Sequence, residues 1–293
     1  MHRRSFLTLL LATVAPVGFV RSRWLQQKAD FFEAPVETQQ RFYELLDLAR
    51  WKGWDQLPVG RCMGEAGKTF LGTPYVAGTL EGPGEVCRIN LQGVDCVTFF
   101  EYLLGFARTL KKGKAKFEDF ARELVFIRYR NGQLGDYTSR LHYMSDWILD
   151  NVRKGVVKDI TAALGGKPYH PTVSFMSRHP DRYPALKQHP ELVAKMQQIE
   201  QHLSNAQLFF IPRSDVAAIE PKLQTGDILA FTTSIQGLDY GHTGIVYRAD
   251  GAAYLLHAST EAHKVFMDTT VARYLAKREK FTGVTVVRPL EPV

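Results

Sequence analysis

The chain has 293 residues, of which 45% are hydrophobic and 12% aromatic, so its composition is that of a folded protein with a sizeable core. This length suits one large domain or two small ones. The formal net charge is +7, and three arginines within the first 22 residues account for +3 of it. The remaining charge is mild and comes without a basic and aromatic motif, so the composition predicts no nucleic-acid partner.

The N-terminus, residues 1–22, has the composition of an export signal. A basic start is followed by an apolar run from Phe6 to about Val20, which is short for a membrane span. The opening Arg3-Arg4-Ser5-Phe6-Leu7 resembles the twin-arginine signature of proteins that are exported folded. Pro16 would directly follow the best cleavage position, which makes that position a poor cleavage site. The alternative to a cleaved signal is therefore retention of the segment as an N-terminal anchor. Both outcomes predict a periplasmic or secreted protein.

Helices are expected to dominate the next part of the chain. Residues 23–60 form a predicted helical extension, because Pro35–Trp51 carries apolar residues at helical spacing. Arg61–Leu71 predicts a second, shorter helix. Tyr75–Leu80 is expected to be extended, and the glycine- and proline-rich residues 81–93 to form a loop.

The following helix, residues 96–110, is apolar over so wide an arc that it should be central and buried. Asp95 precedes it with the chemistry of a helix N-cap, so Cys96 falls on the first turn. Amide groups and the dipole at a helix N-terminus favour a thiolate over a thiol. This position suggests a nucleophile, whereas a lone buried cysteine is more often a packing residue.

The middle of the chain is predicted to be an addition to the core of the fold. Helices are predicted at Phe117–Tyr129, Ser139–Asn151 and Glu191–Leu203, and prolines interrupt much of what lies between. We interpret residues of about 130–212 as a large insertion within a single catalytic domain that spans residues 23–293.

The C-terminal third consists of short β-type runs with turn residues between them. The predicted strands are 227–232, 242–248, 252–258, 264–268 and 284–288. Helices first and an antiparallel sheet afterwards predict an α+β fold.

Two histidines fall on neighbouring strands of this sheet. The sequence Ala249-Asp250-Gly251 predicts a tight turn between the strands that carry His242 and His257. In one register of the hairpin His242 lies opposite His257, and in the other it lies opposite Ser259 with His257 on the diagonal. Both registers place the two imidazoles on one face of the sheet. One ring can therefore orient the other, as the base and orienter of a cysteine hydrolase do.

The spacing of the cysteines bears on two other roles, metal binding and disulfide formation. One thiolate and two imidazoles could hold zinc, but no Cys-x-x-Cys or His-Glu-x-x-His spacing is present, so we expect no metal site. Cys62 and Cys87 are the remaining cysteines, and their spacing leaves open whether they form a disulfide.

Several segments together resemble the NlpC-type bacterial cell-wall hydrolases, a papain-like cysteine peptidase superfamily; they are Gly93–Thr98, Gly226–Leu229, Gly241–Ile245 and Leu256–Ser259. Within that superfamily the closer resemblance is to the N-acetylmuramoyl-L-alanine amidase-like family, in the segments Phe70–Glu81, Tyr137–Tyr143 and Thr232–Asp239. The resemblance implies a papain-like core, in which the helix that bears Cys96 packs on the antiparallel sheet that bears the two histidines.

The resemblance also implies residue roles. Cys96 would be the nucleophile, His242 the general base and later the acid, and His257 the residue that orients His242. Tyr75 would lie near the thiol and help to stabilise the oxyanion. The residues expected to contact the substrate are Asp95, Ser139, Arg140, His142 and Asp239. This chemistry needs no cofactor.

The implied activity is hydrolysis of the amide between N-acetylmuramic acid and L-alanine in fragments of peptidoglycan. Cys96 and His242 are 146 positions apart, and an insertion between catalytic elements usually walls the cleft, so we expect small muropeptides to be the partners. The alternatives are a γ-D-glutamyl endopeptidase that acts within the stem peptide and a non-catalytic peptidoglycan-binding module. The sequence gives no indication of the oligomeric state.

Overall fold

The computed structural model describes residues 27–29 and 31–293, so the predicted export signal lies outside the described residues. The α-helices in this part of the chain are α1 (Val36–Trp51), α2 (Val59–Lys68), α3 (Cys96–Lys111), α4 (Phe117–Arg128), α5 (Met144–Arg153), α6 (Phe175–Arg178), α7 (Pro184–Gln188), α8 (Glu191–Ser204), α9 (Val216–Ile219) and α10 (Val271–Ala276). Single 3-10 turns occur at Trp54–Gln56, Arg130–Gly132, Tyr137–Ser139, Ala162–Leu164, Pro180–Arg182, Arg213–Asp215 and Glu220–Lys222.

The strands form a small sheet and a large one. They are β1 (Gln27–Ala29), β2 (Phe32–Ala34), β3 (Cys87–Arg88), β4 (Val157–Asp159), β5 (Lys167–Tyr169), β6 (Leu208–Pro212), β7 (Ile228–Thr233), β8 (Tyr240–Ala249), β9 (Ala252–Ser259), β10 (Lys264–Thr270) and β11 (Phe281–Pro289). The large sheet has the order β10-β9-β8-β7-β11-β6-β5, with β4 also paired to β11, and all of its pairs are antiparallel. The chain therefore combines helices with an antiparallel sheet, as the sequence predicted.

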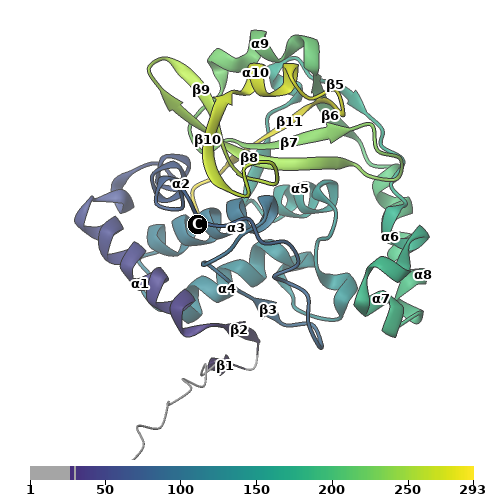
Figure 1. Cartoon of the computed structure of the whole chain (residues 1–293), viewed down its shortest axis with the longest axis horizontal. Helices are drawn as coiled ribbons and strands as arrows, with labels where there is room; N and C mark the ends of the chain where they lie inside the picture. The colour runs from purple at the N-terminus through teal and green to yellow at the C-terminus, as the bar shows by residue number, and fades with distance from the viewer. Residues whose placement is uncertain (1–26, 30) are drawn as a thin grey trace, which may run out of the picture.

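The large sheet lies between two helical layers (Figure 1). Alternate residues of β7 show how: Ile228 and Ala230 join the core beneath helices α1 to α5, whereas Leu229 and Phe231 join the core under α9 and α10. Helix α3 is the central element of the larger layer, and every residue from Thr98 to Leu110 is buried. The prediction of a central, buried helix at this position is confirmed.

A buried ion pair joins α3 to α4. The Arg128 Nε–H group donates to Glu101 Oε2 over 2.7 Å, and the indole of Trp147 donates to Glu101 Oε1 over 3.1 Å. Both charged residues are only 1% exposed, so each depends on these partners for the hydrogen bonds that water would otherwise supply. The pair fixes the orientation of α3 within the helical layer.

The region predicted as an insertion, residues 130–212, builds part of the sheet as well as a separate lobe. Strands β4, β5 and β6 extend the large sheet beyond β11, while α6 and α8 pack together over a small core of their own. The helix predicted at Ser139–Asn151 begins only at Met144, because Arg140 is extended and bridges Tyr129. That prediction was wrong for the first five residues.

Two further boundaries differ from the sequence prediction. The segment 75–80 is not a strand: Pro74 and Tyr75 form isolated bridges, and turns follow. The extension at residues 23–60 contains the predicted helix α1 but also strands β1 and β2, which pair with β3 in the small sheet. The other predicted helices and all five C-terminal strands are confirmed within one to three residues at each end.

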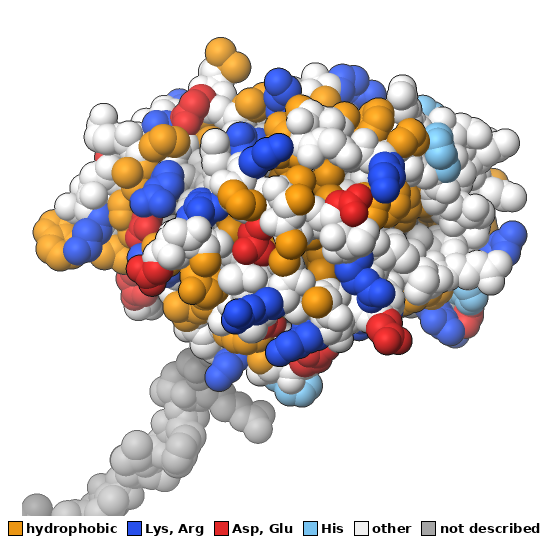
Figure 2. Space-filling view, turned by 90° about the horizontal axis from the view of Figure 1, so that it is seen from above, with side chains coloured by type: hydrophobic (Ala, Val, Ile, Leu, Met, Phe, Trp, Pro, Cys, Tyr) orange, Lys and Arg blue, Asp and Glu red, His pale blue; other side chains and the backbone are white. Residues whose placement is uncertain are grey.

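The surface agrees with the mild charge of the sequence. On the face seen in Figure 2, above α9 and α10, basic and acidic side chains are interspersed among hydrophobic ones. No helix among the described residues is long and apolar enough to cross a bilayer.

Candidate active site

The N-terminus of α3 is fixed by a capping box. One carboxylate oxygen of Asp95 accepts hydrogen bonds from the amides of Val97, over 3.0 Å, and Thr98, over 2.7 Å. The Thr98 hydroxyl in turn accepts from the Asp95 amide over 2.9 Å. The predicted N-cap is thus confirmed, and it leaves the amide of Cys96 outside the box, at the first position of the helix.

The segment that bears Tyr75 is held beside this helix end. The amide of Val76 donates to the carbonyl of Val94 over 2.9 Å, and the amide of Tyr75 donates to His263 over 3.0 Å. A Cβ atom at Gly93 would lie 2.5 Å from the Val76 side chain, so glycine is required for this close approach. The Tyr75 side chain is therefore held close to Cys96.

The two histidines lie on the hairpin of β8 and β9. Ala249 pairs with Ala252, and Asp250 and Gly251 form the turn with φ of +49° and +77°, as a type I′ turn requires. This is the second of the two predicted registers, so Gly244 lies opposite His257 and His242 lies on the diagonal. A Cβ atom at Gly244 would lie 2.9 Å from that of His257, so glycine leaves room for the imidazole.

The thiol and both imidazoles line one small cavity of about 80 Å³, together with Tyr75. The Nε2 atom of His242 lies 2.6 Å from Nδ1 of His257, so a hydrogen bond joins the two rings. The hydroxyl of Thr243, next to His242, donates to the Cys96 carbonyl over 2.7 Å. This bond ties the start of α3 to β8 and so fixes the thiol relative to the imidazoles.

The surroundings of the imidazoles keep both neutral. The ring of His242 stacks among the rings of Phe231, Tyr274 and Phe281, with centroids 6.0 to 6.3 Å apart. Burial there lowers the pKa of His242 well below its ordinary value, and the neighbouring cations lower it further. Burial likewise lowers the pKa of His257 to about 4, although a nearby carboxylate opposes this change.

The thiol does not have the depressed pKa that the helix N-terminus led us to expect. Burial raises the pKa of Cys96 to about 12, and the negative charge of Asp95 adds to the rise. Desolvation disfavours the thiolate, which is opposite to the effect expected of a helix N-terminus. The resting site pairs a neutral thiol with a neutral imidazole, so the proton must leave the sulfur during attack.

The sequence did not indicate Asp268, which lies next to the imidazole pair. Its Oδ2 atom is 3.4 Å from Nε2 of His257, the ring nitrogen that does not face His242. Asp268 is on β10, two residues after Phe266, which pairs with His257. The alternation of side chains along β10 was the available signal. It could identify Asp268 only if the register of β9 against β10 were known, and the loop at residues 260–263 does not reveal that register.

Three of the predicted substrate residues, Asp95, Ser139 and Asp239, make hydrogen bonds within the protein. Asp95 is engaged in the helix cap, and Ser139 accepts from Gly135 and donates to Asp136 within its own turn. Asp239 is 2% exposed and accepts from both the amide and the hydroxyl of Ser145, near the start of α5. Among the residues that line the cavity, none of these three occurs.

Arg140 and His142 lie together near a different cavity. Arg140 is 4% exposed and donates to Glu81 over 2.8 Å, and it lines a cavity of about 810 Å³ beside α7 and α8. His142 packs on the ring of Tyr137 and hydrogen-bonds its carbonyl oxygen over 2.7 Å. The two residues are therefore placed by contacts within the protein.

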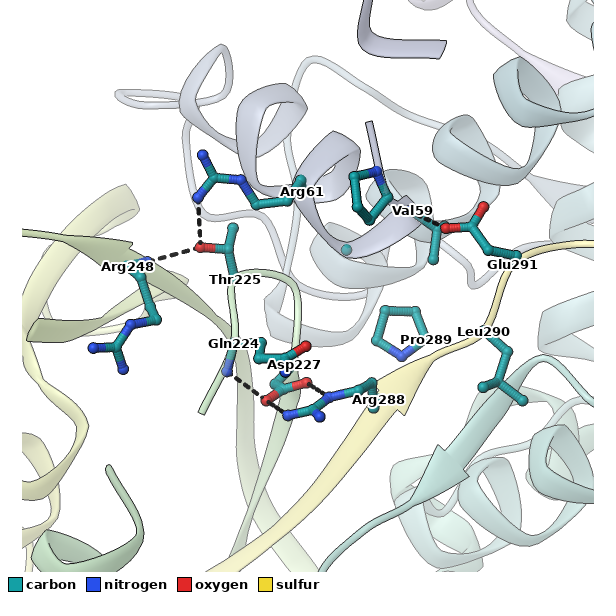
Figure 3. Close-up of a pocket in the computed structure, with 12 residues that line it drawn as sticks. Val59, Arg61, Gln224, Thr225, Asp227, Arg248, Arg288, Pro289, Leu290 and Glu291 are labelled. Atoms are coloured by element: carbon teal, nitrogen blue, oxygen red, sulfur yellow. Dashed lines mark hydrogen bonds and ion pairs between the residues drawn. The ribbon is translucent and has the colours of Figure 1, made fainter. Parts of the chain in front are cut away.

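A further cavity, of about 450 Å³, lies between α2 and the sheet (Figure 3). Its arginines are engaged internally: Arg288 forms a two-pronged ion pair with Asp227, and Arg248 donates to backbone carbonyls. No thiol or imidazole belongs to its lining. Although it is larger, this cavity lacks the groups that catalysis requires.

The remaining cysteines are buried and free. Cys62 is on α2 and Cys87 on β3, and the structure forms no disulfide between them. Burial raises the pKa of both thiols, to about 12 and about 11. Within the described part of the chain, no three histidine, cysteine or acidic side chains are grouped to hold a metal ion.

Helices packed on an antiparallel sheet, with a thiol and two imidazoles around one cavity, define a mixed helix-and-sheet protein with a candidate hydrolytic site. Residues 65–284 match the family model described as N-acetylmuramoyl-L-alanine amidase-like. The chain therefore belongs to the N-acetylmuramoyl-L-alanine amidase-like family.

Solved structures agree with this family. A structure of an N-acetylmuramoyl-L-alanine amidase from Bacteroides uniformis is 40% identical, with a TM-score of 0.75 over 79% of this chain and 99% of the other. A Bacteroides fragilis structure, provisionally described as a xylanase, is 42% identical, with a TM-score of 0.71 over 76% and 98%. A Legionella pneumophila protein shares the fold at 19% identity, with a TM-score of 0.66 over 88% and 96%. No curated protein matches the chain.

Proposed function

We propose that this protein is a cysteine-dependent amidase, of the NlpC-type papain-like superfamily, that cleaves the bond between N-acetylmuramic acid and L-alanine. The observation that carries the proposal is the meeting of Cys96, at the first position of α3, with the bonded pair His242–His257 in one cavity. Membership of the amidase-like family supports the choice of bond.

In the first half of the reaction the Cys96 sulfur attacks the lactyl carbonyl carbon. Because Nε2 of His242 is bonded to His257, its Nδ1 atom is the one left to receive the thiol proton. The carbonyl oxygen gains the negative charge, and we assign the amide of Cys96 and the hydroxyl of Tyr75, two residues at this cavity, as its donors. The protonated His242 then gives its proton to the L-alanine nitrogen as the carbon–nitrogen bond breaks.

In the second half water releases the acyl group. The muramoyl group is now bound to Cys96 as a thioester, and the peptide with a free amine has left. His242, neutral again, takes a proton from water as its oxygen attacks the thioester carbonyl. The carbon–sulfur bond breaks, the sulfur regains its proton from His242, and the carboxylic acid of the muramoyl group departs.

The substrate is proposed to be a small muropeptide outside the cytoplasm. A cavity of about 80 Å³ admits little more than the scissile amide, so sugar and peptide must extend away from it across the surface. The twin-arginine-like start of the sequence and the cell-wall substrate are consistent with a periplasmic or secreted protein.

Glycoside hydrolysis, which the description of one structural neighbour suggests, fits this cavity poorly. Glycosidases mostly use two carboxyl groups, about 5 to 9.5 Å apart, on either side of the scissile bond. Among the described residues that line the cavity, Glu261 is the one acidic residue, and it is paired to Arg278 over 2.5 Å. Hydrolysis of an acyl bond by the thiol remains the chemistry that the residues support.

A digest with product identification by mass spectrometry tests the proposal. Purified MurNAc-tripeptide and the free tripeptide are incubated with the wild type and with the Cys96→Ala variant. Cys62→Ala serves as the matched control because its thiol is buried and does not line the cavity at Cys96. We expect release of the intact tripeptide from MurNAc by the wild type and the control only. Cleavage after D-glutamate would favour the endopeptidase, and ligand binding without any cleavage would favour a binding module.

A further inference from the structure

Among the described residues, the outer nitrogen of the second imidazole has a carboxylate oxygen nearby but no hydrogen-bond partner. His257 is 1% exposed, and its Nε2 atom makes no hydrogen bond that meets normal geometry within the described residues. The nearest carboxylate oxygen is Oδ2 of Asp268, 3.4 Å away. A buried N–H group aimed at a carboxylate at this separation needs only a small movement to form a hydrogen bond.

The strand that bears Asp268 is irregular at this residue. Strand β10 pairs regularly with β9 up to Met267, opposite Leu256, and resumes at Thr270, opposite Tyr254. The extra residue forms a β-bulge, a feature that often redirects a side chain next to an active site. The other oxygen of Asp268, Oδ1, accepts from the amide of Thr269 over 2.6 Å, which leaves Oδ2 for His257.

The hydrogen bond between the imidazoles limits the tautomers that both rings can adopt. If His242 is to accept the thiol proton at Nδ1, its own proton must be on Nε2 and must point to Nδ1 of His257. That nitrogen of His257 must then be unprotonated, so the proton of His257 lies on Nε2. The direction of the hydrogen bond between the imidazoles, and of the thiol proton transfer to His242, therefore depends on the group that Nε2 of His257 faces.

We propose that Asp268 is a positioning residue that accepts from Nε2 of His257 and thereby fixes the tautomers of both imidazoles for catalysis. This inference rests on the proposed function, since it places Asp268 at the end of one chain of hydrogen bonds. That chain begins at the catalytic thiol and continues through His242 and His257. When His242 becomes an imidazolium, the carboxylate stabilises the charge through the intervening ring, and no proton has to reach Asp268.

Charged side chains of both signs surround the imidazole pair. Arg278 lies 3.9 Å from its Oδ2 atom and also binds Glu261, while Lys280 lines the same cavity. Both cations disfavour a charged imidazole pair, and Asp268 and Glu261 oppose them. Cys96, Tyr75 and Tyr274 complete the titratable groups around the pair.

Nitrogen NMR of protein labelled with ¹⁵N-histidine tests the tautomers without any substrate. The signals of His242 and His257 are assigned with His242→Gln and His257→Gln. We expect the wild type to carry the proton on Nε2 of both rings at neutral pH. A proton on Nδ1 of wild-type His257 would overturn the proposal, whatever the folding of any variant.

The Asp268→Asn variant tests the consequence. Glu261→Gln is the matched control, because it removes the charge of another carboxylate at the same site, one that is paired to Arg278. We expect Asp268→Asn to mix the tautomers of His257 and to lower kcat for the muropeptide by about 100-fold, with little change in KM. Unchanged tautomers and kcat, or an equal loss in the control, would contradict the role of Asp268. If the wild type cleaves no muropeptide while the tautomers respond, the proposed function fails, and only the effect of Asp268 on the tautomers stands.

Discussion

At Cys96 two physical effects oppose each other. The helix N-terminus favours a thiolate, whereas burial and the carboxylate of Asp95 favour the thiol, and the balance raises the pKa to about 12. The base beside it, His242, has a pKa lowered by burial among aromatic rings. Both groups are therefore neutral at pH 7, and nucleophile and base exchange their proton only as the substrate reacts.

The pH dependence of Cys96 alkylation checks this description. We expect the rate with iodoacetamide to increase steadily with pH beyond 9, because the raised pKa leaves the thiol protonated there. The activity should persist below pH 6.5, since a lowered pKa keeps His242 in its neutral, basic form on the acid side. The Cys96→Ala variant reports any reaction of the other thiols. Fast alkylation that is independent of pH between about 6 and 8 would instead indicate a thiolate–imidazolium pair.

Helix α3 is the element that presents the nucleophile, and Asp95 affects it in two separable ways. As N-cap its oxygen accepts from two amides, and as a charge it raises the pKa of the thiol. Asparagine caps a helix about as well as aspartate but is neutral, whereas alanine removes both effects.

The Asp95→Asn and Asp95→Ala variants should therefore differ. We expect Asp95→Ala to lower the free energy of unfolding by about 1 kcal/mol and Asp95→Asn to change it little, as measured by urea denaturation. Asp95→Asn should nevertheless speed the alkylation of Cys96 at neutral pH, because the thiol pKa falls. Equal stability of the two variants would exclude the capping role, and an unchanged alkylation rate in Asp95→Asn would exclude the effect of charge.

Elements whose signals are local were predictable from the sequence. The apolar arc and the Asp95 cap specify α3, and Ala249-Asp250-Gly251 specifies the turn of the hairpin that carries both histidines. Local signals left two hairpin registers open, and the structure has the one with Asp250 and Gly251 in the turn.

Features that depend on distant contacts were not predictable. Strands β4, β5 and β6 are short. Each forms by pairing with another strand of the large sheet. The family resemblance implied substrate binding for Asp239. Its hydrogen-bond partner Ser145 is 94 positions away, so only the fold brings the two residues together. Asp268 was missed for the same reason. The raised pKa of the Cys96 thiol could not be predicted, because a sequence indicates the position of a residue on a helix but not its desolvation.

At the scale of the whole molecule, the site exists only where two layers meet. The helical layer supplies Cys96, the sheet supplies His242 and His257, and the bond from Thr243 to Cys96 joins them. The lobe around α6 and α8 lies between these parts in the sequence and packs on a core of its own. The long separation of nucleophile and base in the sequence is thus consistent with a site that is formed by tertiary packing.

The covalent intermediate tests the central claim most directly. Wild-type protein mixed with MurNAc-tripeptide, quenched in acid within the first turnover and digested for mass spectrometry, should yield the peptide that contains Cys96 with a muramoyl group bound as a thioester. The same treatment of Cys96→Ala should yield no adduct. An adduct of muramoyl-L-alanyl-D-glutamate would identify an endopeptidase, and product formation without any adduct on Cys96 would contradict cysteine-dependent cleavage.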